Sequence, residues 1–157
     1  MANIFTVNEV ADLRKCLQIR REVFVTEQGV PDELEVDEWD DLARGIHVLA
    51  VDDNQQPVAT ARLIPYGSPL NSEHQATSNT GKVQRVAVRQ MVRGLGLGRA
   101  VMTAIEQLAH QQGYRHLVLD AQCTAAEFYR QLGYQQDSPE IFLDAGIEHV
   151  RMCKTLF

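Results

Sequence analysis

The segment best suited to chemistry joins a strand-like run to a helical pattern and reads Arg93-Gly94-Leu95-Gly96-Leu97-Gly98-Arg99. Its glycines stand at alternate positions and remove β-carbons where backbone N–H groups must approach a ligand closely. The start of the following helix adds unpaired N–H groups and the positive end of the helix dipole. Arg93 and Arg99 flank the glycines and can donate charge-assisted hydrogen bonds to phosphate oxygens. The segment therefore predicts a cradle for an anion such as a pyrophosphate.

Two well-known phosphate-binding motifs do not fit this spacing. The dinucleotide-binding pattern G-x-G-x-x-G places Arg99 at its third glycine when it starts at Gly94, and Val101 when it starts at Gly96. This spacing excludes a dinucleotide-binding fold, although Asp120 follows at about the twenty-residue distance at which such a fold carries its acidic residue. A P-loop is excluded because no Gly-Lys-Ser/Thr follows. A turn whose glycines only let a strand pack tightly against a helix stays open.

The elements around the glycines must form a strand, helix and strand unit. Residues 82–88 predict the first strand, residues 98–111 a helix with an apolar stripe, and residues 116–119 a buried strand. A connection of this kind makes the two strands parallel, and ligands bind at the carboxyl ends of such strands. The glycine segment lies at one of these ends.

The rest of the chain predicts a mixed α/β sheet with no internal repeat. Asn8 can cap a first helix that ends near Gly29, and its apolar face includes Val10, Leu13, Leu17 and Phe24. The other predicted elements are a strand at 4–7, a hairpin of 46–51 with 58–64, a surface loop at 65–80, a helix at 125–132 and a closing hairpin whose last strand is 148–155.

Length and composition predict one domain over residues 1–157. The net charge of −6 argues against a general nucleic-acid binder. No apolar run approaches the roughly 20 residues that cross a bilayer, and the first residues do not have the pattern of a signal peptide, so we expect a cytoplasmic protein. The cysteines at 16, 123 and 153 predict separate, reduced thiols. Seven acidic residues between positions 32 and 41 predict a solvated loop or a short helix.

Two motifs together identify a resemblance to a known family. The segment Arg93–Gly98 resembles the R/Q-x-x-G-x-G/A motif of the GNAT superfamily of N-acetyltransferases. Downstream, Ala125-Ala126-Glu127-Phe128-Tyr129-Arg130-Gln131-Leu132-Gly133-Tyr134 resembles the A-x-x-F-Y-x-x-x-G-F/Y helix of that family. Residues 21–31 and 142–152 are similar to a subgroup of small bacterial members, many of which have no assigned substrate. The resemblance implies a largely antiparallel, twisted sheet with helices on both faces.

The resemblance also implies acetyl-coenzyme A as the acyl donor, no metal, and direct transfer to an amine. Val86, Ala87 and Val88 match the strand that splays from its neighbour and binds the cofactor arm through its backbone. The glycine segment, Arg93–Arg99, matches the pyrophosphate site. Tyr129 matches a tyrosine that acts as general acid, and packing of its ring is the alternative role. Gln122 stands where many relatives carry an asparagine near the cofactor arm.

The acceptor side departs from the family pattern. Gln84 stands where several relatives carry a glutamate base, and an amide cannot serve as one. We expect Glu27, Gln28 and His149 near the acceptor pocket. A surface or structural role fits each of them at least as well as a role in binding the acceptor. Arg62 and Arg85 either face an acidic acceptor or pair with the acidic segment.

Three functions remain open from the sequence. A small-molecule amine is the leading acceptor, without nucleic acid or membrane, and a homodimer is compatible with it. The alternatives are a coenzyme A-binding or regulatory module without catalysis, and transfer to an amine of a protein. An acyl intermediate on Cys123 is disfavoured, because nothing near it in the sequence marks an activated thiol.

Overall fold

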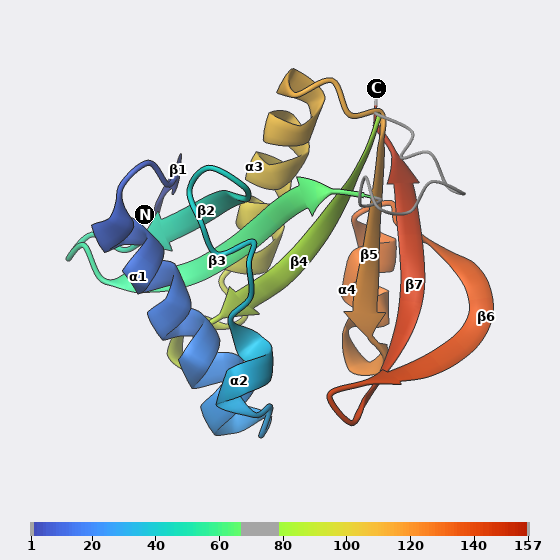
Figure 1. Ribbon diagram of the computed structural model, residues 1–157, viewed down its shortest axis with the longest axis horizontal. Coiled ribbons are helices and arrows are strands. Elements are labelled where there is room, and N and C mark those ends of the chain that lie inside the picture. Colours follow the sequence, from blue (N-terminus) through green and yellow to red (C-terminus); the bar gives the residue numbers. More distant parts are fainter. Residues whose placement is uncertain (1, 67–78, 157) are drawn as a thin grey trace.

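The computed structural model describes residues 2–66 and 79–156, and its centre is a seven-stranded sheet (Figure 1). The strand order is β1-β2-β3-β4-β5-β7-β6, in which β4 and β5 are parallel and the other neighbours antiparallel. The strands are β1 (Asn3–Thr6), β2 (Ile46–Val51), β3 (Pro57–Pro65), β4 (Thr80–Val88), β5 (His116–Gln122), β6 (Gln135–Asp144) and β7 (Ile147–Thr155). The predicted mixed, largely antiparallel sheet is confirmed. Most of the loop predicted at 65–80 lies outside the described residues.

Helices cover both faces of the sheet, as predicted. In front of it in Figure 1 lie α1 (Val10–Arg20) and α2 (Asp32–Glu35), and behind it lie α3 (Leu97–Gln111) and α4 (Ala126–Gln131). A π-helical turn, η1 (Arg21–Glu27), continues α1, and two short 3₁₀ turns, η2 (Gln90–Val92) and η3 (Cys123–Ala125), precede α3 and α4. Within residues 2–66 and 79–156, no helix is long and apolar enough to cross a membrane.

Each face of the sheet buries its own apolar cluster. On the α3 side, Val101, Met102, Ile105 and Ala109 recur at helical spacing and are at most 1% exposed, which confirms the predicted stripe. On the α1 side, the buried residues include Leu13, Cys16, Ile19 and Val23. The three cysteines are free, as predicted.

The first helix differs from its prediction at its start and on its exposed face. Glu9, and not Asn8, is its N-cap, and no side chain caps it. Val10, expected on the buried face, is 56% exposed. The end near Gly29, whose φ is +76°, agrees with the prediction. The π-helical turn lies after these positions, at residues 21–27, where its period departs from the constant 3.6 residues of the prediction.

A bulge in β4 bends this strand in the middle of the sheet. Thr60 pairs with Ala87 but Arg62 pairs with Gln84, so β4 carries one more residue than β3 between these pairs. Arg85, in the bulge, has φ +56°, which is uncommon for a residue other than glycine. Such bulges bend a strand and often lie beside functional sites.

Beyond the bulge, β4 separates from β5. Their parallel pairing ends at Val83 with Leu119, yet β4 continues to Val88 and β5 to Gln122. Figure 1 shows the two strands diverging towards these ends. The backbone groups of residues 84–88 on the β5 side therefore have no strand partner. The splay that the family resemblance implied is present.

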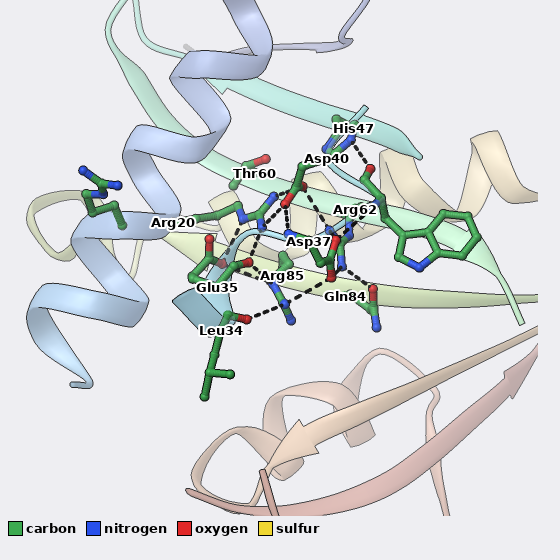
Figure 2. A network of polar contacts seen from close by, with 12 residues as sticks. Arg20, Leu34, Glu35, Asp37, Asp40, His47, Thr60, Arg62, Gln84 and Arg85 are labelled. Atoms are coloured by element: carbon green, nitrogen blue, oxygen red, sulfur yellow. Dashed lines mark hydrogen bonds and ion pairs between the residues drawn. The ribbon is translucent and has the colours of Figure 1, made fainter. Parts of the chain in front are cut away.

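A network of charged side chains holds α2 against the sheet (Figure 2). Arg20 of α1 is 1% exposed, and its Nε donates to Glu35 Oε1 at 3.0 Å. Its Nη2 donates to Asp40 Oδ2 at 3.0 Å. Arg62 of β3 is equally buried, and its Nη1 donates to Asp37 Oδ1 at 2.7 Å and to Asp40 Oδ1 at 2.9 Å. Asp40 thus joins both buried arginines.

The prediction of a solvated acidic loop is wrong for Glu35 and Asp40, which are buried in this network. Glu35 is only 4% exposed, and the Asp40 side chain only 2%. Arg20 and Arg62 are buried on the sheet face, and a buried charge is costly unless an opposite charge pairs with it. The acidic residues supply that charge. The short helix predicted as an alternative is α2.

Asp40 is ionised across the physiological range. Its burial raises the pKa, but the hydrogen bond and charge of Arg20 outweigh this effect and lower the pKa of Asp40 from 3.8 to about 2. A carboxyl group with a lowered pKa stabilises the folded state fully above its unfolded value, and this contribution is lost as the pH falls towards about 2.

We predict that Asp40→Asn lowers the free energy of unfolding at pH 7 by about 3 kcal/mol, because it breaks a buried charge pair. Urea unfolding at several pH values measures this. The difference between wild type and variant should shrink by on the order of 2 kcal/mol between pH 5 and pH 2. Asp137→Asn, at an exposed aspartate, should change stability by less than about 0.5 kcal/mol. A difference that stays constant with pH would contradict the assignment.

Candidate functional site

The separation of β4 from β5 opens a cavity of about 480 Å³. Its walls come from η1, α2, the free edge of β4, the end of β5, α4 and the β6–β7 hairpin. The volume lies within the range of about 300–1,000 Å³ that is typical of small-molecule sites. The cavity is therefore the candidate site.

The free edge of β4 forms one wall. Val86, Ala87 and Val88, the residues predicted to hold a cofactor arm, all line the cavity. Ala87 and Val88 pair with β3 and Val86 lies in the bulge, while the edge of the strand that faces β5 is unpaired. Backbone N–H and C=O groups there can bind a ligand that lies along the strand, in the manner of an added strand.

The glycine turn follows directly and leads into α3. Gly94 and Gly96 both have φ +83°, a left-handed conformation that favours glycine. A β-carbon on either would meet no atom within 4 Å, so both backbones face open space. Gly96 is the N-cap of α3, and no side chain caps this helix. The turn therefore presents unpaired N–H groups of a 15-residue helix to the surface.

Gly98 has a different role from its two neighbours. A β-carbon there would lie 3.1 Å from Phe128 Cζ, so the glycine lets α3 pack against α4. Leu97 packs against the core, and Leu95 is 73% exposed. The tight-packing alternative left open by the sequence thus holds for Gly98 and not for Gly94 or Gly96.

The two arginines of the turn differ in their contacts. Arg93 lines the cavity, donates from Nε to the Val88 carbonyl at 3.0 Å and pairs through Nη2 with Glu27 at 2.9 Å. Arg99 is exposed beside the start of α3. Glu27 does not line the cavity, contrary to expectation, because Arg93 holds it at the rim.

Tyr129 projects from α4 towards the cavity and is 8% exposed. Its ring packs edge-to-face on Phe128 and Tyr134, so the structural role considered from the sequence is real. Among the described residues its hydroxyl has no hydrogen-bond partner. Burial raises the pKa of the Tyr129 hydroxyl, which keeps it protonated at neutral pH.

Two glutamines join opposite walls of the cavity. Gln122, at the end of β5, donates from Nε2 to Gln28 Oε1 at 2.8 Å, and Gln28 follows η1. Both line the cavity. The sequence placed Gln122 near a cofactor arm and Gln28 near an acceptor, but it did not indicate that the two touch.

Arg62 and Arg85 belong to the same ion network but differ in their position relative to the cavity. Arg62 does not line the cavity, because its guanidinium pairs with Asp37 and Asp40 and donates from Nη2 to Gln84 Oε1. Arg85 does line the cavity, while its Nε donates to the Glu35 carbonyl at 3.2 Å. Both arginines therefore pair with the acidic segment, and of the two Arg85 also lines the cavity.

His149 lies on β7 opposite Gln122 and lines the cavity. It is 8% exposed and stacks on Phe142, with ring centroids 5.8 Å apart. Its Nδ1 lies 2.7 Å from the Ile147 carbonyl. His149 therefore lies at the candidate cavity, and its role towards an acceptor stays a prediction.

A charged group that the sequence did not indicate as part of this site lies at the end of the cavity where β4 and β5 still pair. Asp120 of β5 accepts from Arg151 Nε at 2.9 Å and lies 3.1 Å from Lys82 Nζ. Burial raises the pKa of Asp120, but these cations outweigh it and lower the pKa. Extending the strand beyond Leu119 would have placed Asp120 on the same face as Gln122. Within the described residues, no cluster of His, Cys, Asp or Glu is arranged to hold a metal.

The splayed strands, the glycine turn and the cavity between them define an acyltransferase fold of the GNAT type. Residues 15–156 match the acetyltransferase (GNAT) domain family, and the chain belongs to this family. It is 38% identical over 153 residues to BSU40680 of Bacillus subtilis, covering 97% of this chain and 95% of that protein. It is 34% identical to YjcF of the same organism, an uncharacterized N-acetyltransferase, and the match covers 98% of this chain and 99% of that protein.

Solved structures show the same fold. An acyl-CoA N-acyltransferase from Pseudomonas aeruginosa is 28% identical with a TM-score of 0.80, covering 98% of this chain and 99% of that chain. An aminoglycoside 6'-N-acetyltransferase complexed with coenzyme A has a TM-score of 0.70 at 15% identity, and the match covers 100% of this chain and 97% of that chain. Acyl transfer is the activity that family membership supports.

Proposed function

We propose that this protein transfers an acetyl group from acetyl-coenzyme A directly to the amine of a small molecule, through a ternary complex. The observation that carries the proposal is the cavity between the separated ends of β4 and β5, with Tyr129 on one wall. The glycine turn at the start of α3 follows from the same strand. One continuous path thus joins an anion cradle to an acyl-transfer site.

Coenzyme A fits the groups along this path. Its diphosphate suits the exposed N–H groups of the turn, with Gly94 and Gly96 leaving room and the helix dipole favouring the negative charge. Arg99 is available to pair with a phosphate. The amide groups of the pantetheine arm can hydrogen-bond to the free edge at Val86 and Val88, and a backbone N–H there can polarise the thioester carbonyl.

Tyr129 would supply the proton for the departing thiolate. Attack of a neutral amine on the thioester forms the C–N bond, and collapse of the tetrahedral intermediate breaks the C–S bond. The Tyr129 hydroxyl is unpaired among the described residues and protonated at neutral pH, as a general acid must be. An acyl intermediate on Cys123 lacks support, because Cys123 does not line the cavity.

The geometry favours a small acceptor over an amine of a protein. The contact between Gln28 and Gln122 crosses the cavity and narrows access from that side. A cavity of about 480 Å³ also suits a small molecule. Apolar and charged side chains both line it, including Phe24, Leu34 and Arg85. A panel should therefore span 2-phenylethylamine, spermidine, glycine and glucosamine 6-phosphate.

We predict that Tyr129→Phe lowers kcat at least about 100-fold with the best amine of the panel, because it removes the general acid. Release of free thiol from acetyl-coenzyme A measures turnover, and calorimetry measures coenzyme A binding, which should change less than about threefold. Tyr114→Phe, at a tyrosine outside the cavity, should keep wild-type activity. Tight binding of coenzyme A without turnover on any amine would instead support the non-catalytic module.

We predict that Gly96→Ala weakens coenzyme A binding about tenfold or more, because a methyl group enters the space assigned to the diphosphate. Gly113→Ala is the matched control, since Gly113 has φ +88° and equally open surroundings but lies at the far end of α3. Both variants should lose about 1 kcal/mol of stability from the left-handed conformation. Equal coenzyme A affinity for both would contradict the placement of the diphosphate.

A further inference from the structure

We propose that His149 is the general base that removes a proton from the acceptor amine. The inference rests on the proposed function and answers the question that Gln84 raises, because an amide at that position cannot accept the proton. A primary alkylamine is mostly protonated near pH 7 and cannot attack a thioester until it is neutral. A base must therefore line the cavity in which Tyr129 serves as the acid.

The contact of His149 with its own hairpin fixes its tautomer. Its Nδ1 lies 2.7 Å from the Ile147 carbonyl, and a carbonyl oxygen can only accept, so Nδ1 carries the hydrogen. In the neutral ring, Nε2 then holds the lone pair. Among the described residues, Nε2 has no hydrogen-bond partner. The stacked Phe142 holds the plane of the ring.

The other charged groups of the cavity are less suited to this task. Glu35 is 4% exposed and pairs with Arg20 and Arg85. Asp120 pairs with Lys82 and Arg151, and these cations lower its pKa. The remaining cavity residues with a charge or a titratable hydroxyl are Asp144, Arg93 and Tyr129.

Asp144 is the one further carboxylate among the described cavity residues, and it is exposed at the β6–β7 turn. The Asp144 side chain is open to solvent, whereas His149 is 8% exposed, lines the cavity and has no hydrogen-bond partner at Nε2 among the described residues. The geometry therefore points to His149, and Asp144 becomes the alternative that the experiment must separate.

The proton transfers balance through the two residues. The ammonium group gives one proton to His149 Nε2, and the neutral amine attacks the thioester carbonyl. As the C–S bond breaks, the thiolate takes the Tyr129 proton, and the resulting phenolate takes the second proton from the amine nitrogen. His149 then releases its proton to water. The products are the acetamide, coenzyme A as a thiol, and one proton in solution.

The test compares His149→Gln with two matched variants, Asp144→Asn in the same cavity and His110→Gln at an exposed histidine of α3. The acceptor is the panel amine with the highest kcat/KM for wild type, assayed from pH 5.5 to 9. We expect His149→Gln to lower kcat/KM about 100-fold at pH 7 and to change the acid limb of the pH–rate profile, because the variant lacks the general base. Coenzyme A affinity should not change. His110→Gln should keep both the rate and the profile, and Asp144→Asn should keep the profile and lower kcat/KM far less than His149→Gln does.

Two further measurements separate a base from a structural residue. Hydroxylamine is already largely neutral at pH 7, so as the acceptor it should reduce the deficit of His149→Gln to less than about tenfold. Added imidazole should restore activity to His149→Ala. The inference is overturned if His149→Gln keeps more than half of the wild-type kcat/KM, or if Asp144→Asn shows the loss instead. These outcomes overturn the role of His149 and leave the proposed function standing. If wild type acetylates no amine of the panel, the proposed function itself fails.

Discussion

The end of the pairing between β4 and β5 is the constraint on which the site depends. Parallel pairing stops at Val83 with Leu119, and the bulge at Arg85 turns β4 away while β5 continues straight to Gln122. A continuous sheet would satisfy every backbone group of β4 internally. The separation instead leaves a strand edge facing a cavity, directly before the turn that begins α3. The cavity and its position beside the glycine turn are therefore consequences of one interruption in the sheet.

The buried charges explain how this interruption is tolerated on the α1 side. Arg62 lies opposite Gln84 in the register with β4, next to the bulge, and its guanidinium holds both the Gln84 amide and the acids that follow α2. The same contacts place α2 as a wall of the cavity. The arrangement also removes Arg62 from the cavity, so Arg85 is the arginine of this network that remains beside the site.

The parts of the fold and of the site that depend on local residue patterns could be predicted from the sequence. The glycines at 94 and 96, the apolar stripe of α3 and the strands on either side of this helix follow from spacing alone. The family resemblance, and not a local pattern, indicated Tyr129, which lines the cavity together with His149. The ion network was not predictable in this way, because Arg20, Arg62 and Asp40 meet only after the sheet forms. The bulge at Arg85 likewise leaves no mark in the sequence, since arginine rarely adopts a positive φ.

We propose that backbone N–H groups of the free β4 edge and of the glycine turn bind coenzyme A. The most direct test is a titration of the ¹⁵N-labelled protein with coenzyme A, followed through the backbone amide resonances. We predict the largest shifts at Val86, Val88 and residues 94–99, with little change at Gly113 at the other end of α3. Shifts that leave the amides of 94–99 unmoved, or no saturable shifts at all, would contradict it.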